Sequence, residues 1–300
     1  MVSNPTTPAA NDGCIDIASP LTPDDKRAAV PFDTSLLDRL TPTMKKFTLT
    51  DKVAVVTGGA RGLGFNMCQA LAEVGIRGIA IMDLQQEVGE ESASELSEQS
   101  GVDVRFYRID VRDAAAVNLA VQNIVEHYGR IDVLINSAGT AQSRIPAENY
   151  DIEMFRRQID VNLTGSFIVA QAVAREMIKG NRGGSIIFIA SMSSTIVNYP
   201  QEQCCYNATK AGVAHLTKSL AAEWARYNIR VNAISPGYMN TALNRVPGID
   251  YYKNIWIENT PQKRLGNIDE INHLAVYLAS DASTFMTGSQ LLIDGGFHVY

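Results

Sequence analysis

The chain has 300 residues, 46% of them hydrophobic, with a formal net charge of −6 and a sequence pI near 5.3. This length and apolar content suffice for one large domain or two small ones. The acidic balance, without a basic cluster, excludes the electrostatic footprint of a nucleic-acid-binding protein, so no nucleic-acid partner is expected.

The first 46 residues differ in composition from the rest. Six of the eleven prolines lie there, at positions 5, 8, 20, 23, 31 and 42. We predict that residues 1–46 form a flexible, Pro-rich arm. Its start lacks a basic stretch followed by an apolar run, and it carries acidic residues, so neither a secretory signal nor a transit peptide is expected.

From residue 47 onward, short β-branched runs alternate with longer helical patterns, without an internal repeat or a second linker. Strands are predicted at residues 53–57, 77–83, 104–110, 131–139, 184–191, 229–237 and 290–296. Helices are predicted at residues 62–75, 85–99, 113–128, 151–180, 204–227 and 268–280. Several strands are apolar throughout, as in a parallel sheet covered on both faces. Residues 47–300 are therefore predicted to form a single doubly wound, Rossmann-type α/β domain with a seven-stranded parallel sheet and helices on both faces.

The cysteines and the length of the apolar runs indicate the cellular compartment in which the protein is expected. The four cysteines form no Cys-x-x-Cys pair and have no histidine at a metal-ligand spacing, which predicts reduced thiols and no metal site. Runs such as KVAVVTGG are far too short to span a bilayer. A cytoplasmic protein without a membrane segment is therefore expected.

The first predicted strand runs directly into the glycine-rich stretch TGGARGLG, and a helical pattern follows. Such glycines allow a tight turn and a close approach of the backbone to a pyrophosphate at the helix N-terminus. Because the loop lies between a strand and a helix, it predicts dinucleotide binding. The residues assigned to this contact are Gly58, Arg61, Gly62, Leu63 and Gly64.

Asp83 ends the second predicted strand. A carboxylate there would bind the adenosine ribose hydroxyls and repel a 2′-phosphate, which favours NAD over NADP. Arg61 favours the opposite preference, because a basic side chain in the loop would attract that phosphate. NAD is the predicted cofactor, and NADP is the alternative.

Further small and polar residues follow the next two strands. Asp110 ends the third predicted strand, where it would lie with Val111 beside the adenine, although a helix cap is an equally open interpretation of Asp110. The stretch NSAG closes the fourth strand. Small Ala138 and Gly139 would let a cofactor pass close by, and Asn136 can tie neighbouring backbone together. All five are predicted to contribute to the cofactor site.

Four polar residues form the candidate reaction centre. Ser191 ends the fifth predicted strand, and Asn162 lies in a helical region, either as a catalytic group or as a satisfied polar group that braces a strand. Tyr206 precedes Lys210 by four residues in a helical stretch, so both side chains share one helix face. A cation near a phenol favours the phenolate and lowers its pKa from about 10 toward neutral pH. The spacing alone equally describes a half-buried tyrosine beside a solvated lysine.

Together, TGGARGLG, NSAG, Asn162, Ser191, YNATK and SPGYMNT resemble the short-chain dehydrogenase/reductase family in order and spacing, over essentially everything after residue 47. The stretch from GSIIFIAS to ISPGY is similar to the yeast and fungal polyol and ketose branch, above all to D-arabinitol 2-dehydrogenase and L-xylulose reductase. Two departures are present. Ser137 stands where relatives often carry asparagine, and a long gap between Ser191 and Tyr206 leaves Ser193 as a rival serine.

The resemblance implies a role for each residue of the reaction centre. Tyr206 would exchange a proton with the substrate oxygen, and Lys210 would lower the pKa of Tyr206 and hold the nicotinamide ribose. Ser191 would donate a hydrogen bond to the same substrate oxygen, and Asn162 would anchor a water that links Lys210 to solvent. Tyr206 and Lys210 would therefore contact the cofactor as well as the substrate.

The resemblance also places the region after the sixth strand near the nicotinamide. Pro236 and Gly237 would turn the backbone around the ring, with Met239 and Thr241 near its carboxamide. Residues 240–267 lack clear periodicity and are interpreted as a substrate lid, or as an ordinary pair of surface helices. Four polar side chains ahead of Tyr206 would suit a substrate with many hydroxyls, or would form a wet loop: Asn198, Gln201, Glu202 and Gln203.

The leading hypothesis is an oxidoreductase that transfers a hydride between NAD(H) and a sugar alcohol or ketose, with D-arabinitol to D-ribulose as the first choice. The alternatives are reduction of L-xylulose, sorbose or fructose (the mannitol dehydrogenase reaction), with NADP(H) as a possible cofactor. An alternative of another class is a non-catalytic NAD(P)-binding regulator. Family members are commonly tetramers, so a homotetramer is expected.

Overall fold

The computed structural model describes residues 28–241 and 249–299. Its centre is a seven-stranded parallel sheet with the strand order β3-β2-β1-β4-β5-β6-β7. The strands are β1 (Val53–Thr57), β2 (Gly78–Asp83), β3 (Asp103–Arg108), β4 (Val133–Asn136), β5 (Gly184–Ile189), β6 (Ile229–Pro236) and β7 (Gln290–Ile293). The predicted doubly wound, Rossmann-type α/β fold is confirmed.

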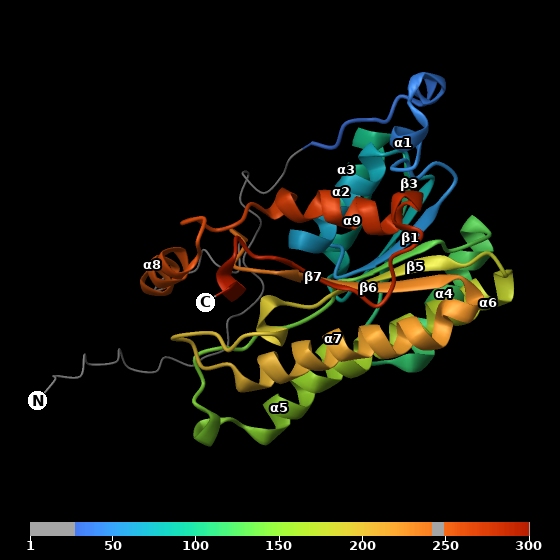
Figure 1. The fold of residues 1–300 in the computed structure, drawn as a ribbon. Helices are drawn as coiled ribbons and strands as arrows, with labels where there is room; N and C mark the ends of the chain where they lie inside the picture. Colours follow the sequence, from blue (N-terminus) through green and yellow to red (C-terminus); the bar gives the residue numbers. More distant parts are fainter. Residues whose placement is uncertain (1–27, 242–248, 300) are drawn as a thin grey trace, which may run out of the picture.

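Helices cover both faces of the sheet (Figure 1). On one face lie α2 (Gly62–Glu73), α3 (Gln86–Ser100) and α9 (Asn272–Ala279). On the other lie α4 (Ala114–Tyr128), α6 (Ser166–Gly180) and α7 (Cys204–Trp224). Shorter helices are α1 (Pro42–Lys45), α5 (Ile152–Ile159) and α8 (Asp250–Asn259). The predicted helix over 151–180 is divided, because a π-helical turn, Asp160–Gly165, separates α5 from α6.

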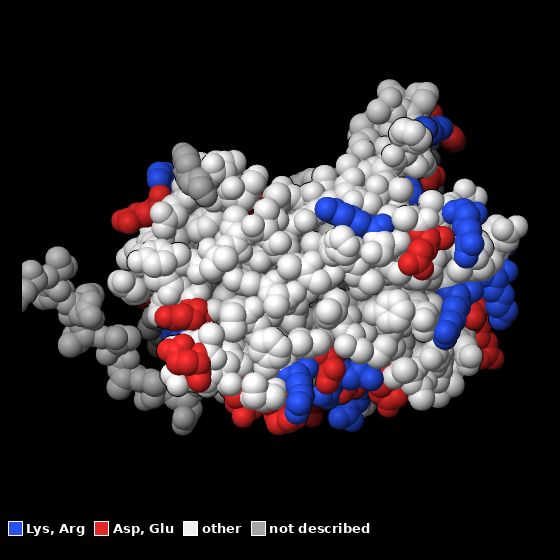
Figure 2. All heavy atoms as spheres, turned by 60° about the horizontal axis from the view of Figure 1, so that its bottom comes forward, with Lys and Arg blue, Asp and Glu red and all other residues white. Residues whose placement is uncertain are grey.

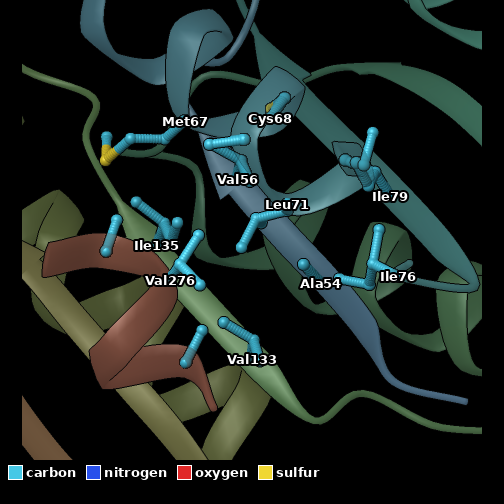
Figure 3. Packing of buried hydrophobic residues seen from close by; sticks show 14 of the residues in the cluster. Ala54, Val56, Met67, Cys68, Leu71, Ile76, Ile79, Val133, Ile135 and Val276 are labelled. Atoms are coloured by element: carbon cyan, nitrogen blue, oxygen red, sulfur yellow. The ribbon is translucent and has the colours of Figure 1, made fainter. Parts of the chain in front are cut away.

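Strand side chains alternate between the two apolar layers, as the pleat of a strand requires. In β1, Ala54 and Val56 pack with the layer under α2 and α9, whereas Val53 and Val55 pack with the layer over α4 and α6. Figure 3 shows the first layer, where Leu71 of α2 lies among residues of β1, β2 and β4. Burial on both faces explains why these strands are apolar throughout.

The described part of the predicted arm lies against the domain. The Ala29 side chain is 6% exposed, and its backbone N–H donates to Gln99 Oε1 at 2.9 Å. The Phe32 ring covers Gly75, where a Cβ atom would lie 2.6 Å from it. Ala29 and Phe32 therefore contact the domain, whereas most residues from 30 to 46 are exposed, and residues 1–27 lie outside the described part of the chain.

The topology defines where a ligand binds. The chain leaves β1 toward β2 and β3, and later returns on the other side of β1 to form β4. Parallel doubly wound sheets bind ligands at this switch point, beyond the carboxyl ends of the strands. The loops after β1, β2, β4, β5 and β6 therefore surround one site.

Candidate active site

A cavity of about 470 Å³ lies at the carboxyl ends of these strands. Its wall contains most of the residues that the sequence assigned to the cofactor and the reaction: Gly58, Arg61, Gly62, Leu63, Gly64, Asp83, Asp110, Val111, Ala138, Gly139, Ser191, Tyr206, Lys210, Pro236, Gly237, Met239 and Thr241. Two predicted residues, Asn136 and Asn162, are not among the described residues of this wall. The topology thus gathers segments far apart in sequence into one site.

The glycine loop after β1 requires glycine at two positions. Gly58 has a φ of 63°, and a Cβ there would lie 2.9 Å from the Ala138 Cα. A Cβ on Gly64 would lie 2.1 Å from the Gly58 carbonyl oxygen. The backbone is therefore packed too closely for side chains, and the N-terminus of α2 opens directly onto the cavity. This arrangement fits a pyrophosphate.

Asp83 lies at the cavity wall, at the end of β2. Its Oδ2 accepts from the Ala60 N–H at 3.3 Å, and its Oδ1 accepts from the Gln85 N–H at 3.1 Å. With its amide oxygen turned toward Arg61, the Gln85 side chain accepts from that guanidinium at 2.9 Å. The Asp83 carboxylate is thus held by backbone donors, while the Arg61 guanidinium is held by the side chain of Gln85, two residues further along the chain.

Asp110 and Arg112 form an ion pair of 2.5 Å in the cavity wall. The hydrogen bonds and charge of Arg112 lower the pKa of the Asp110 carboxyl. The helix-cap interpretation of Asp110 is wrong, because the N-cap of α4 is Asp113, which accepts from the Ala115 and Ala116 N–H groups. Asp110 therefore lies in the cavity wall and does not cap α4.

Asn136 ties neighbouring segments together, as its position in the sequence suggested, and lies behind the cavity wall. Its Oδ1 accepts from the Thr57 hydroxyl at 3.1 Å, and its Nδ2 donates to the Ser166 carbonyl at 2.8 Å. Thr57 Oγ1 in turn accepts from the Ala138 N–H at 3.0 Å. Since strand side chains alternate, Asn136 points toward α6 and braces the loop behind the cavity.

Asn162 lies in the π-helical turn between α5 and α6, and is 1% exposed. Its Oδ1 accepts from the Thr140 N–H and its Nδ2 donates to the Thr140 carbonyl, both at 2.8 Å. Nδ2 also donates to Thr209 Oγ1 at 3.2 Å. A Cβ on Gly139 would lie 3.2 Å from Asn162 Oδ1 and 3.6 Å from Lys210 Nζ, so the two groups converge there.

Tyr206 and Lys210 share one face of α7, as predicted, with the ammonium 5.7 Å from the centroid of the phenol ring. Burial lowers the pKa of Lys210 to about 8. Burial also raises the pKa of the Tyr206 phenol, and a hydrogen bond with Ser191 opposes this increase. The lowering of the Tyr206 pKa expected from Lys210 is not seen, because desolvation of the phenol is the largest influence on this pKa and raises it.

The structure distinguishes the two candidate serines. Ser191 lines the cavity together with Tyr206, and its hydroxyl is near enough to oppose the rise in the pKa of the Tyr206 phenol. Ser193 lies behind it and is 4% exposed; its Oγ accepts from Ser191 Oγ at 3.0 Å and donates to Asn198 Oδ1 at 2.7 Å. Ser191 is the serine at Tyr206.

Several wall residues were not predicted from the sequence: Met82, Leu84, Gln85, Ile109, Arg112, Ser137, Thr140, Ala141, Arg157, Val161, Ile189 and Ala190. Most adjoin a predicted residue at a strand end, so their positions could have been inferred from the sheet topology. Arg157 of α5 and Val161 of the π-helical turn do not follow a strand, so the sheet topology does not predict them. They line the cavity because of how these helical segments pack.

The polar residues ahead of Tyr206 are arranged differently from the prediction. The Asn198 and Gln203 side chains are each 6% exposed and bond to one another, whereas Glu202 is exposed. Within the described part of the chain, none of the four lines the cavity. Of the predicted lid, residues 242–248 lie outside the described residues, and the described remainder includes α8. Among the described residues, no helix is long and apolar enough to cross a membrane.

Comparison with known proteins agrees with this geometry. A family model described as enoyl-(acyl carrier protein) reductase matches residues 58–298. The D-arabinitol 2-dehydrogenase (ribulose-forming) of Candida tropicalis is 42% identical over 278 residues, covering 88% of this chain and 97% of that protein. The NADP-dependent mannitol dehydrogenase of Alternaria alternata is 40% identical over 256 residues, covering 84% and 94%. The crystal structure of gox2181 matches with a TM-score of 0.83 and 41% identity, over 86% of this chain and 100% of that chain.

The parallel sheet, the glycine loop and these matches together define an NAD(P)-dependent oxidoreductase that acts on CH–OH groups. The chain belongs to the short-chain dehydrogenase/reductase family, and within it to the polyol dehydrogenase branch. The resemblance noted in the sequence is confirmed. This membership favours the enzyme over the non-catalytic regulator.

Proposed function

We propose that the protein is an NAD-dependent polyol dehydrogenase that oxidises D-arabinitol to D-ribulose. The observation that carries the proposal is the meeting of Ser191, Tyr206 and Lys210 in one cavity with the glycine loop and Asp83. The substrate choice rests on the similarity to the Candida tropicalis enzyme. Reduction of L-xylulose, sorbose or fructose is the alternative, since relatives with those activities are also similar.

In the proposed reaction, Tyr206 as a phenolate removes the proton from the substrate hydroxyl, and Ser191 donates a hydrogen bond to the same oxygen. NAD, when bound, supplies the hydride acceptor. Lys210 stabilises the phenolate electrostatically and binds the nicotinamide ribose. Asn162 Oδ1 keeps one acceptor position for a water beside Lys210, because the Thr140 N–H occupies only the other.

The residues of the wall fit the parts of NAD. The α2 N-terminus and the loop at Gly58 and Gly64 would hold the pyrophosphate, and Pro236 and Gly237 would hold the nicotinamide end with Met239 and Thr241. Asp83 would accept hydrogen bonds from the adenosine ribose and repel a 2′-phosphate, which supports NAD. Arg61 supports NADP as the alternative, although the Gln85 amide holds its guanidinium.

We further infer a homotetramer in the cytoplasm. Figure 2 shows a broad area of one face that carries few charged side chains, with most of the Lys, Arg, Asp and Glu side chains toward its edges. The exposed side of α7 presents small or neutral residues at helical spacing, including Ala208, Ala211 and His215. Such a surface supports helix-to-helix packing between subunits. The free thiols of Cys68, Cys204 and Cys205 support a reducing compartment.

The proposal is tested by a matrix of substrates against both cofactors. D-arabinitol, xylitol and D-mannitol are oxidised with NAD or NADP, and L-xylulose and L-sorbose are reduced with NADH or NADPH, with the absorbance of reduced nicotinamide as the readout. The expected result is the highest kcat/KM for D-arabinitol with NAD, with D-ribulose as the product. A higher kcat/KM for another pair would reassign the substrate or the cofactor within the same family.

A further inference from the structure

Four side chains next to the reaction centre form a closed ring of hydrogen bonds, here called the amide ring. Gln203 Nε2 donates to Asn198 Oδ1 at 2.8 Å, and Asn198 Nδ2 donates to the Tyr238 hydroxyl at 2.8 Å. That hydroxyl donates to Gln201 Oε1 at 3.1 Å, and Gln201 Nε2 donates to Gln203 Oε1 at 2.7 Å. Each member donates to the next in one direction around the ring, which stabilises the whole set cooperatively.

The amide ring is connected to Ser191 through Ser193. Ser193 Oγ donates to Asn198 Oδ1 at 2.7 Å and accepts from Gln203 Nε2 at 3.3 Å. Because its proton is engaged by Asn198, the Ser193 hydroxyl presents an acceptor to Ser191 Oγ at 3.0 Å. The Ser193 backbone N–H donates back to Ser191 Oγ at 3.1 Å. Two contacts from one residue therefore fix the Ser191 oxygen beside Tyr206, and the single Ser191 proton, which is directed at Ser193 in this structure, turns to the substrate oxygen when a substrate binds.

The opposite side of the amide ring is anchored on α8. The Tyr238 ring stacks on Trp256 with centroids 4.1 Å apart and an interplanar angle of 7°. Phe297 packs edge-on against Tyr238 at 5.3 Å. Trp256 is 2% exposed, so the stack is part of the packed interior. The Tyr238 hydroxyl is consequently held in place for Asn198.

The polar character of this cluster requires an explanation. Buried hydrogen-bonded groups stabilise a fold no more than well-packed apolar side chains of the same shape would, but they define geometry. Gln203 precedes Tyr206 at the start of α7, Asn198 follows β5 by a loop, and Tyr238 follows β6. The amide ring thus ties together the three segments that carry Ser191, Tyr206 and the nicotinamide end of the cavity.

We propose that Asn198 and Gln203 are positioning residues, which act through Ser193 to align the Ser191 hydroxyl with Tyr206. The proposal rests on the proposed roles of Ser191 and Tyr206. Tyr238 completes the amide ring, because its hydroxyl orients Asn198 and its aromatic ring is fixed by Trp256. Loss of one ring member leaves its neighbours free to rotate away from Ser193.

The test is a double-mutant cycle of Asn198→Ala and Ser191→Ala, measured on whichever alcohol the unmodified protein oxidises fastest. Asn198→Ala is expected to lower kcat about ten- to hundredfold, because Ser193 loses its acceptor. The same change in the Ser191→Ala background is expected to lower kcat by less than about twofold, because the affected hydroxyl is already absent. The Kd for NADH is expected to stay within about twofold of the unmodified protein in every variant.

A control and a second variant separate positioning from folding. Asn272 of α9 is also a buried asparagine, 4% exposed, and its Nδ2 donates to Asn66 Oδ1 of α2 at 2.6 Å, on the face of the sheet opposite α7. Asn272→Ala is expected to lower Tm while kcat is retained. Should Asn198→Ala lose its thermal transition, Tyr238→Phe keeps the stack on Trp256 and removes only the ring hydroxyl; it is expected to lower kcat about fivefold.

Two results would overturn the proposal. One is an unchanged kcat in both Asn198→Ala and Tyr238→Phe when Ser191→Ala lowers kcat, which refutes the positioning role and leaves the proposed function intact. The other is an equal fold loss from Asn198→Ala in both backgrounds, which indicates an effect independent of Ser191. A different preferred alcohol would change only the proposed function, because the cycle compares variants on the same substrate.

Discussion

The Lys210 ammonium donates a 2.8 Å hydrogen bond to the carbonyl oxygen of Ile189, the last residue of β5. This bond ties the middle of α7 to the end of the central sheet. Tyr206, one turn earlier on α7, is held at the cavity by the same packing. The position of the phenol is therefore defined by the sheet, and the ammonium is buried beside it.

Burial of Lys210 predicts a specific dependence of stability on pH. The pKa of this ammonium is lowered to about 8 in the folded protein, whereas a lysine in an unfolded chain has a pKa of about 10.4. Between these pH values the unfolded chain binds more protons, so this group makes the free energy of unfolding rise with pH. Below pH 8 the buried charge destabilises the fold.

Lys210→Met removes that contribution. The Tm of the unmodified protein minus that of Lys210→Met is expected to increase between pH 8 and pH 10, with the variant at least as stable at pH 7. Lys218→Met changes an exposed lysine on the same helix and is the matched control, with no such trend expected. Thermal melts across this pH range measure the difference. Parallel curves for the protein and Lys210→Met would contradict the assigned burial effect.

Cofactor preference is expected to depend on Asp83. Asp83→Asn removes the charge and leaves an oxygen to accept from the Ala60 or Gln85 N–H. Because hydrogen bonds to charged groups contribute about 1.5–3 kcal/mol, kcat/KM with NAD is expected to fall about ten- to hundredfold, and kcat/KM with NADP to rise. Arg61→Gln is the opposite change and is expected to increase the NAD preference. An unchanged ratio in Asp83→Asn would show that this carboxylate does not select the cofactor.

The glycine loop offers a comparison of two similar changes. A Cβ on Gly64 meets the Gly58 carbonyl, a backbone atom that cannot move aside without shifting the loop. Gly62 has a φ of 58° but no neighbour within 4 Å of its Cβ position. Gly62→Ala is therefore expected to lower the free energy of unfolding by about 1–2 kcal/mol from backbone strain alone, and Gly64→Ala by more. Chemical denaturation measures both, and equal losses would show that the contact in the loop is relaxed.

The sequence predicted the sheet, the glycine loop and most of the cavity wall because each depends on short local patterns. Four features depend on packing instead. Asn136 turns toward α6 because of strand parity at the exact end of β4, and Arg157 joins the wall because of how α5 docks. The sign of the Tyr206 pKa shift depends on burial, which the spacing to Lys210 does not reveal. The amide ring joins loops whose conformation no periodic pattern encodes.

The central claim is that Tyr206 is the acid/base group of an NAD-linked alcohol oxidation. The most direct measurement is the initial rate of NADH formation from D-arabinitol by the unmodified protein and by Tyr206→Phe, alongside the Kd of each for NADH. The account predicts a rate about 10²- to 10⁴-fold lower in Tyr206→Phe, with the Kd retained, because the ring remains and only the ionisable hydroxyl is lost. A rate in Tyr206→Phe close to that of the unmodified protein would contradict it.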